Sequence, residues 1–487
     1  MKKVQDGSTR NRLYFIHAAI AIAIMIFFRF IPPFGEMTPL GMELLGIFIG
    51  LLWAWIKCDM VWPSVLAFMF LGFSSYTPSG TVSLSAAFGN PLIQLIIWLL
   101  VFAAILMVSG ISEQIAQRLI ASKYTKGRPW VLSIVILVAV YVGAAFGANL
   151  ALILICWEFV STISKQVGYG KEDRWPKMMV VSIVFTSCIG TVLMPFSVGV
   201  VASFGYLTAA SDGLVGNYNY FSYLVFSLIF SLSVFAIFML INKYIVRPDM
   251  SKLKEVNVDM GEIPPINTKQ KLAVGALIVL VLVTILPSIL PANIQAYMNM
   301  IGTPLLVLAV PAFITIFRDK EGKPYFTFQE LAGRGVLWNM IFMVAAAITM
   351  GGAISSPEAG FNATFISAFM PILSGMSPYL FALVIVVVTL ILTNLINNAV
   401  AGAIMVPLMY SFSTAIGANP LLITALIIFA SNVGLLLPCA SPVGAMLAGN
   451  KEWMNPIDVV YFSSLYILAT IIAVAIIGIP IGSLFFQ

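Results

Sequence analysis

The sequence predicts an all-α polytopic membrane protein with about eleven transmembrane helices and two re-entrant helical hairpins. The 487 residues are 61% hydrophobic and 9% charged, which is less charge than a water-soluble chain of this length carries on its surface. Apolar runs of about 20 residues, long enough to cross a bilayer, recur along the whole chain. Two further apolar runs are too long for one span and carry small or polar residues at their middle.

The apolar runs predict the individual elements in order. Single spans are expected at 13–33, 39–56, 60–75, 91–117, 176–211, 219–245, 271–290, 299–317, 335–355, 419–448 and 459–486. Glycine, proline and polar residues interrupt the runs 176–211 and 419–448, which we expect to be broken helices. The runs 129–163 and 376–416 are expected to form the hairpins, each entering and leaving the membrane on one face. Residues 1–12 are polar and lack a cleavage-site pattern, so we expect the first helix to be retained.

The distribution of positive charge supports this topology. With the N-terminus in the cytoplasm, only Arg29 of the 25 Lys and Arg residues lies toward the outer side. Cytoplasmic loops of membrane proteins carry an excess of these residues. Counting either hairpin as one full span inverts every later loop and removes the bias. The sequence therefore predicts a multi-pass protein of the inner (plasma) membrane, with a cytoplasmic N-terminus and an outer C-terminus.

The charged loop 246–270 separates two halves with similar layouts. Each half has spans that lead into a hairpin, then a broken helix and a final span. The halves enter the membrane from opposite sides, which indicates an inverted repeat, although a shared layout can also arise without one. Inverted repeats place a binding site near the bilayer midplane, where the broken helices meet.

The sequence contains no grouping of residues that indicates a catalytic site. The single histidine, His17, lies in the first span, where a packed or interfacial role is expected. The four cysteines show no metal-binding spacing and are expected to be free thiols; they are Cys58, Cys156, Cys188 and Cys439. Glu43 and Glu158 are the acids best placed for an intramembrane function, but both could also pair or reach the interface. We predict neither an enzyme nor a nucleic-acid-binding protein.

Neutral polar residues interrupt the apolar runs near the C-terminus. Asn394, Asn397 and Asn398 lie together in one run, and Pro438, Ser441, Pro442 and Gly444 break the next. Polar, non-helical backbone at membrane depth is tolerated where it lines a cavity. Unwound carbonyls with Asn or Thr side chains suit a sodium ion, and the N-terminus of a half-helix suits an anion. The second arm of each hairpin starts at such an N-terminus, with Asn149 in the first and Asn398 in the second.

These residues resemble those of the divalent anion:sodium symporters, a family within the larger ion transporter superfamily. That family carries a Ser-Asn-Thr motif at each hairpin tip and a proline-containing break in the helix that follows. Here Asn397-Asn398-Ala399 stands at the second tip, with Thr393 five residues before Asn398, and Ala440-Ser441-Pro442 occupies the break. The resemblance implies sodium binding by Asn149, Thr393, Asn398 and the carbonyl of Ala440. It implies that substrate is bound by Asn149, Ser197, Asn397, Asn398, Ser441 and Pro442.

The resemblance also implies an architecture and a mechanism. It predicts a homodimer with scaffold helices in 1–128 and 271–355, and a transport domain formed by 129–245 and 376–487. The transport domain would cross the membrane as a rigid body, which is an elevator form of alternating access. The expected function is secondary transport of an organic anion, a dicarboxylate or other carboxylate, coupled to sodium. Carboxylate exchange without sodium is the alternative, and a cation/proton antiporter fits less well because the tips lack acids.

The first half departs from the family's motifs. Its tip reads Gly147-Ala148-Asn149-Leu150 and keeps only the asparagine, and its broken helix lacks the double proline. The threonine that follows each motif asparagine, and that reaches the substrate carboxylates in the family, is replaced by Leu150 and Ala399. A site that loses such hydrogen-bonding partners loses affinity for the group they held. We therefore expect a substrate less polar than succinate or malate, or one held by other groups.

Overall fold

The computed structural model describes residues 2–120, 127–147, 149–215, 218–255, 264–288, 290–373 and 375–486, and within them it is built of helices. Arg318 and Pro324 form an isolated β-bridge. Nine helices of the described residues are long and apolar enough to cross a bilayer, and the bent pair α13–α14 would make a tenth. The chain is thus an all-α polytopic membrane protein, as predicted.

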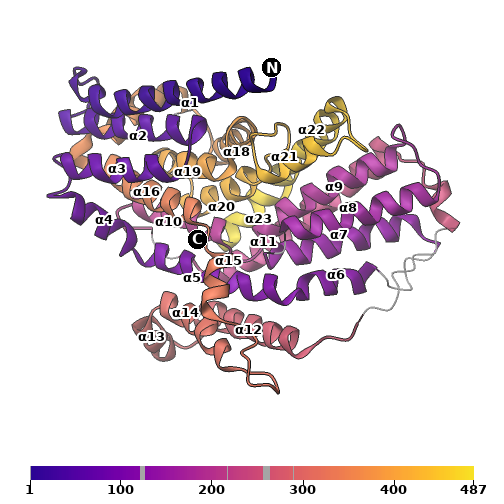
Figure 1. The fold of residues 1–487 in the computed structure, drawn as a ribbon. Coiled ribbons are helices and arrows are strands. Elements are labelled where there is room, and N and C mark those ends of the chain that lie inside the picture. The colour runs from indigo at the N-terminus through magenta and orange to yellow at the C-terminus, as the bar shows by residue number, and fades with distance from the viewer. Residues whose placement is uncertain are drawn as a thin grey trace.

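The first half contains the first predicted hairpin and the first broken helix. Helices α7 and α8 are the arms of hairpin 1, and α9 and α10 form the broken helix (Figure 1). The helices are α1 (Lys2–Phe27), η1 (Phe28–Phe30), α2 (Pro39–Lys57), α3 (Val61–Phe73), α4 (Gly80–Phe88), α5 (Pro91–Ser109), α6 (Ile111–Ile120), α7 (Pro129–Ala145), α8 (Asn149–Gln166), α9 (Arg174–Thr191), α10 (Val198–Ala210), α11 (Tyr220–Ile241), η3 (Asn242–Val246) and η4 (Ser251–Glu255).

The second half repeats this order. Helices α18 and α19 are the arms of hairpin 2, and α20 and α21 form the second broken helix. The helices are α12 (Thr268–Ile285), η5 (Leu286–Ser288), α13 (Ala292–Ile301), α14 (Thr303–Phe313), η6 (Ile314–Ile316), α15 (Phe328–Gly335), α16 (Trp338–Ser355), η7 (Pro357–Ala359), α17 (Phe361–Leu373), α18 (Pro378–Leu395), α19 (Asn398–Ile416), α20 (Pro420–Ser431), α21 (Pro442–Gly449), α22 (Pro456–Ala473), η8 (Val474–Gly478) and α23 (Ile479–Phe485).

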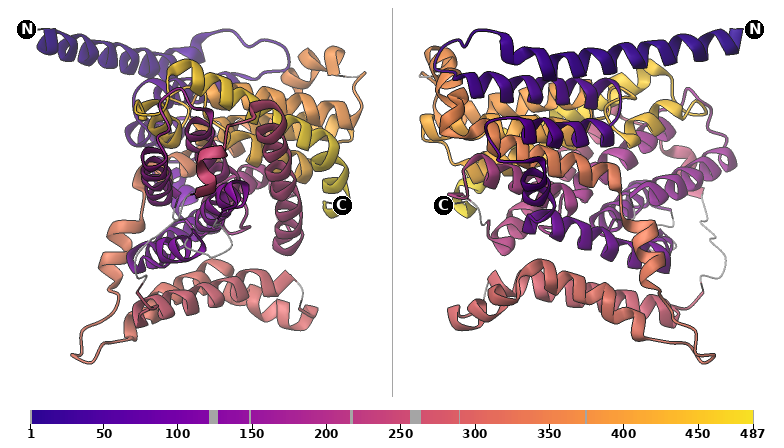
Figure 2. Two further views of the ribbon diagram at one scale, coloured as in Figure 1. Left: turned by 90° about the vertical axis from the view of Figure 1, so that its right-hand side faces the viewer. Right: turned by 60° about the vertical axis from the view of Figure 1, so that its left-hand side comes forward.

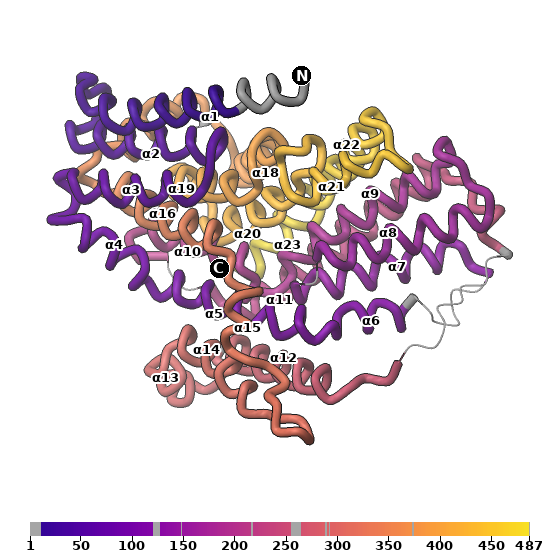
Figure 3. The backbone as a smooth tube through the Cα atoms, viewed as in Figure 1, coloured from indigo at the N-terminus to yellow at the C-terminus, as the bar shows by residue number. Residues whose placement is uncertain are grey.

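Helices α1 and α2 lie along one edge of the molecule, and α12, α13 and α14 lie along the opposite edge (Figure 2). The arms of hairpin 2 and helix α20 lie between these edges, and the tube in Figure 3 follows α7, α8 and α9 side by side at one end. Large apolar side chains are exposed on α1 and α11, among them Phe15, Phe27 and Leu232. Such exposure is expected where helices face lipid instead of water.

Several element boundaries differ from the prediction. The predicted span 91–117 ends at Ser109, because Gly110 adopts a left-handed conformation (φ 65°) and α6 starts at Ile111. Helix α13 bends by 68° into α14 at Gly302. Helices α4, α15 and α17 were not predicted as elements. The first two have nine and eight residues, shorter than the spans that hydropathy detects, and α17 occupies a stretch for which we predicted no span.

Contacts between loops agree with the predicted sidedness. Lys165, in the last turn of α8, forms an ion pair of 2.8 Å with Glu452, after α21. Thr38, before α2, donates a hydrogen bond of 2.6 Å to the carbonyl of Glu358, after α16. In each pair the charge pattern places both loops on one side of the membrane. Each arm of hairpin 2 is 18 or 19 residues long, so length alone would allow it to cross, and its re-entrant path stays a prediction.

A buried polar triangle joins the two halves. Ser182 of α9 lies 2.7 Å from the hydroxyl of Tyr466 in α22, and this hydroxyl donates to Asn242 Oδ1 at 2.8 Å. Asn242 Nδ2 closes the triangle by donating to Ser182 Oγ at 3.3 Å. All three residues are fully buried. Each side chain therefore hydrogen-bonds the other two, and buried polar groups need such partners.

We predict that Tyr466→Phe lowers the free energy of unfolding by about 1–2 kcal/mol, because Asn242 and Ser182 lose a buried partner. Thermal unfolding of the purified protein in detergent measures the effect. Tyr461→Phe is the control, since Tyr461 lies on the same helix and is 47% exposed. Equal stability of the two variants would contradict the role of the triangle.

Candidate functional site

The tip of hairpin 2 is held against the break in the second broken helix. Ile396 and Asn397 are extended and separate α18 from α19. The backbone N–H of Asn398 donates to the carbonyl of Ala440 at 3.1 Å, which joins the tip directly to the break. Gly434 permits this close approach, because a Cβ atom there would clash with the Asn398 amide.

Three oxygens converge on the Asn398 amide at this tip. The amide of Asn398 lies 2.8 Å from Thr393 Oγ1, 3.0 Å from the carbonyl oxygen of Ala440 and 3.2 Å from that of Ser431. With its nitrogen turned inward, the amide donates to all three atoms. With Oδ1 turned inward, it completes a group that we call the second-tip oxygens: Thr393 Oγ1, Asn398 Oδ1, Ser431 O and Ala440 O. Thr393, Ser431 and Ala440 are buried, and neutral oxygens of this kind are suitable ligands for sodium.

Asn394 binds the backbone of the break with its whole amide. Its Oδ1 accepts hydrogen bonds from the N–H groups of Leu435 and Leu436, each at 2.9 Å. Its Nδ2 donates to the carbonyls of Leu390 and Val433 at 2.8 and 2.9 Å. The sequence marked Asn394 as polar within an apolar run but assigned it no role. The structure shows that its amide supplies hydrogen-bond partners to the unwound backbone groups of the break.

The remaining residues predicted at the second tip lie around this arrangement. Asn397 caps α19 by accepting from the N–H of Ala399 at 3.0 Å. Ser441 caps α21 by accepting from Gly444 N and donates to the carbonyl of Gly434 at 2.7 Å. Pro442 is exposed at the first turn of α21. Thr393, Asn398 and Ala440 are therefore brought together, whereas Asn397, Ser441 and Pro442 shape the backbone beside them.

The tip of hairpin 1 is bound differently. Asn149 Nδ2 donates to Thr191 Oγ1 at 3.2 Å, and Asn149 Oδ1 accepts a hydrogen bond from Ser187. Thr191 in turn donates to the carbonyl of Ser187 at 2.9 Å. Both ends of the Asn149 amide are thus occupied by the end of α9. Sequence reasoning named Asn149 but missed Ser187 and Thr191, which stand one helical turn apart on the next element.

The carbonyls of the first break are already used by hydroxyl groups. Tyr223 donates to the carbonyl of Val192 at 2.8 Å, Ser227 to that of Leu193 at 2.7 Å, and Tyr218 to that of Pro195 at 2.6 Å. We call these three acceptors, Val192 O, Leu193 O and Pro195 O, the first-break carbonyls. They are directed into protein contacts. The second-break carbonyls also have protein partners, since the Thr393 hydroxyl donates to Ser431 O and the N–H of Asn398 donates to Ala440 O.

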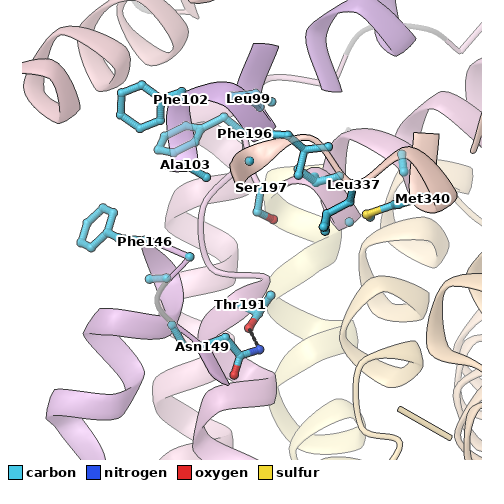
Figure 4. Close-up of a pocket in the computed structure, with 18 of the residues that line it drawn as sticks. Leu99, Phe102, Ala103, Phe146, Asn149, Thr191, Phe196, Ser197, Leu337 and Met340 are labelled. Carbon is cyan, nitrogen blue, oxygen red and sulfur yellow. Dashed lines mark hydrogen bonds between the residues drawn. The ribbon is translucent and has the colours of Figure 1, made fainter. Parts of the chain in front are cut away.

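A cavity of about 540 Å³ lies between the two tips, and we call it the tip cavity. Asn149, Thr191 and Ser197 line it from the first half, and Asn398 and Ser431 from the second. In Figure 4 the Asn149–Thr191 pair lies at one end, and apolar side chains lie at the other. Those apolar residues are Leu99, Phe102, Leu337 and Met340, from α5, the segment before α16, and α16. Neither Ser441 nor Pro442 is among the described residues that line this cavity.

Ser197 is the predicted site residue that faces the cavity with an unused hydroxyl. It occupies the N-cap position of α10 without a side-chain capping bond, and its Oγ is buried without a hydrogen-bond partner among the described residues. The first N–H groups of a helix have no partner within the helix. Val198 and Gly199, the first residues of α10, also line the cavity. This end of α10 can therefore donate several hydrogen bonds to an anion.

The two candidate acids lie elsewhere. Glu43 forms an ion pair of 2.8 Å with Arg29, the residue predicted to lie on the outer side. Glu158 lines a second cavity of about 540 Å³, between α8 and the loop after α21, together with Glu452. The Lys165 side chain hydrogen-bonds Glu452 and lowers the pKa of this loop carboxyl below its usual value. Neither Glu43 nor Glu158 contributes to the lining of the tip cavity described above.

No family model matches the chain. It is similar to the sodium-dependent dicarboxylate transporter SdcS of Staphylococcus saprophyticus, with 24% identity over 170 residues, or 33% of this chain and 32% of the relative. SdcS of Staphylococcus aureus is 23% identical over 151 residues, or 31% of this chain and 28% of the relative. The matches thus span about a third of these relatives.

The fold resembles that of the YdaH transporter of Alcanivorax borkumensis. The TM-score is 0.59 at 13% identity, and the match covers 91% of this chain and 98% of that one. The relatives and the structural neighbour are transporters and not enzymes, in agreement with the prediction from the sequence.

We predict that Asn394→Ala lowers the free energy of unfolding by about 3 kcal/mol, because Leu435 N, Leu436 N and Val433 O lose their buried partner. The control is Asn397→Ala, which removes one cap bond and should cost about 1 kcal/mol. Thermal unfolding in detergent compares the two. Similar losses in both variants would show that Asn394 is not the main support of the break.

Proposed function

We propose, taking the chain as a member of the divalent anion:sodium symporter family, that it is a secondary transporter of an organic anion coupled to sodium. The converging second-tip oxygens carry this proposal. They provide neutral ligands for a sodium ion beside a cavity that two helix N-termini face. The low identity and partial coverage of the named relatives leave the substrate, the coupling and the mechanism as proposals for this chain.

Sodium would bind at the second tip. Thr393, Asn398, Ser431 and Ala440 come from both arms of hairpin 2 and both sides of the break. An ion there would bind both arms of the hairpin and both sides of the break, and would hold Asn398 with Oδ1 inward. At the second tip the oxygens of Thr393, Ser431 and Ala440 all surround one amide, whereas the first-break carbonyls bind three separate side chains, so we propose one sodium per protomer. A sodium role for Asn149 stays a prediction from the resemblance.

Coupling would follow from the order of binding. A ligand shifts a conformational equilibrium only through its differential affinity for the states. Sodium that orders the second tip would position Ala399 and the start of α19 beside the tip cavity before the anion enters. The anion would then bind between the tips, on Asn149, Ser197 and Asn398.

The position of the tip cavity supports an elevator mechanism. Its asparagine, serine and threonine lining comes from 129–245 and 376–487, the predicted transport domain, whereas the charged Glu113 and Arg334 come from the predicted scaffold. Much of its apolar lining comes from 1–128 and 271–355, the predicted scaffold. In the proposed mechanism, 129–245 and 376–487 move as one rigid body against 1–128 and 271–355 and carry the tips across the membrane. Each protomer of a homodimer would move in this way. The cytoplasmic N-terminus and the plasma-membrane location belong to this proposal.

We predict that Asn398→Ala abolishes sodium-dependent uptake in proteoliposomes, because both the ion ligand and the tip contact to Thr393 are lost. Unchanged detergent solubility and unfolding temperature would show that the variant is folded. Asn362→Ala on α17 is the control, since Asn362 binds only the carbonyl of Ser355 among the described contacts. Wild-type uptake by Asn398→Ala would refute the site assignment.

We also predict that sodium chloride raises the unfolding temperature relative to choline chloride, because an ion that binds the folded state stabilises it by mass action. Thr393→Val should lose this shift. Thr389→Val should keep it, since Thr389 is buried one turn earlier on α18 and donates only to the carbonyl of Ile385.

A sodium-independent gain in unfolding temperature with carboxylates would contradict coupling at this tip. Anion exchange would then explain the cavity better than symport.

A further inference from the structure

The tip cavity has two ends of different chemistry. At one end Asn149 and Thr191 hydrogen-bond each other, and the unpartnered hydroxyl of Ser197 lies away from them, beside Leu337 (Figure 4). Across from the Asn149–Thr191 pair, Leu99 and Met340 present apolar side chains (Figure 4). A ligand that fills the cavity therefore needs a polar head and an apolar body.

The charges that line the cavity do not favour a second carboxylate. Arg334 is the cation among the described lining residues, and it already lies 3.7 Å from Glu330. Glu113 also lines the cavity, and its Oε2 is buried without a hydrogen-bond partner among the described residues. A carboxylate buried without donors or a free cation is strongly disfavoured by its lost hydration. A neighbouring acid adds to this penalty.

Two further positions lack the hydroxyl groups that a dicarboxylate would use. Leu150 and Ala399 directly follow the tip asparagines, and both line the cavity. Their methyl groups cannot donate a hydrogen bond, so these positions add apolar surface beside the polar head group. The free donors suit one carboxylate: the first amides of α10 and the Ser197 hydroxyl.

We propose that the transported anion is an amphipathic monocarboxylate with an aliphatic or aromatic body, and this rests on the function proposed above. Its carboxylate binds at the start of α10, beside Ser197, and its body packs against Leu99, Phe102 and Met340. One sodium with one monoanion moves no net charge. The inside-negative membrane potential, which opposes the entry of each uncompensated anion charge, then does not oppose uptake.

The test compares hexanoate with adipate, which has the same carbon chain and a second carboxylate. Binding to the purified full chain is measured by calorimetry in saturating sodium, below the micelle-forming concentration of the ligands. We expect hexanoate to bind at least tenfold more tightly than adipate. Across butanoate, pentanoate and hexanoate, affinity should rise about fourfold per methylene. Tighter binding of adipate would overturn the inference and leave the proposed function intact.

A double variant controls for non-specific binding. Leu150→Thr with Ala399→Thr introduces the two missing hydroxyls, and Leu150 is 46% exposed, so the fold should tolerate the change. We expect the preference to move at least tenfold toward adipate. An unchanged preference would overturn the assignment of hexanoate to the tip cavity.

Transport distinguishes failure of this inference from failure of the function. If neither hexanoate nor adipate is taken up into proteoliposomes with sodium, the proposed function itself fails. If hexanoate is taken up at a rate that rises steeply with an inside-negative potential, transport is not electroneutral, and the pairing of one sodium with one monoanion is overturned.

Discussion

Unwound backbone inside an apolar protein must find hydrogen-bond partners, and the rest of this structure depends on how that requirement is met. Each unpaired amide or carbonyl in such surroundings costs several kcal/mol. In the second half, Asn394 binds three backbone groups of the break, and Ser441 binds two more. With these groups satisfied, the carbonyls of Ser431 and Ala440 face the tip of hairpin 2.

The two halves meet this requirement with different residues, and this makes a symmetric layout chemically asymmetric. In the first half, Tyr218, Tyr223 and Ser227 saturate the break from α11 and the segment before it. The carbonyls of this break bind three separate side chains, whereas those of Ser431 and Ala440 lie around one asparagine. The first half contributes donors to the tip cavity through Asn149 and Ser197, whereas the second half contributes the converging oxygens. An anion and a cation can therefore be bound beside each other by different halves.

The apolar end of the cavity extends this asymmetry to the proposed scaffold. Residues of α5 and α16 face the tips across the cavity, so the body of a bound substrate would contact one set of helices and its head another. A transporter that moves one set against the other must release those apolar contacts in each cycle. The small number of charged groups at this surface is consistent with such sliding, because buried ion pairs are costly to break.

The sequence by itself determined the class of fold and the positions of the breaks within the long apolar runs, while the re-entrant path of the hairpins and the sidedness of the loops stay predictions. These follow from hydropathy and charge, which depend on residue type along the chain. It also placed Asn149 and Asn398 at helix starts, because each follows a break in an apolar run. Only the tertiary structure decided which backbone oxygens converge, that Gly110 redirects the chain, and that Ser441 and Pro442 lie away from the tip cavity. The direction of a carbonyl depends on partners many residues away, such as Tyr218 for Pro195 and Asn394 for the second break, and no local pattern specifies those pairings.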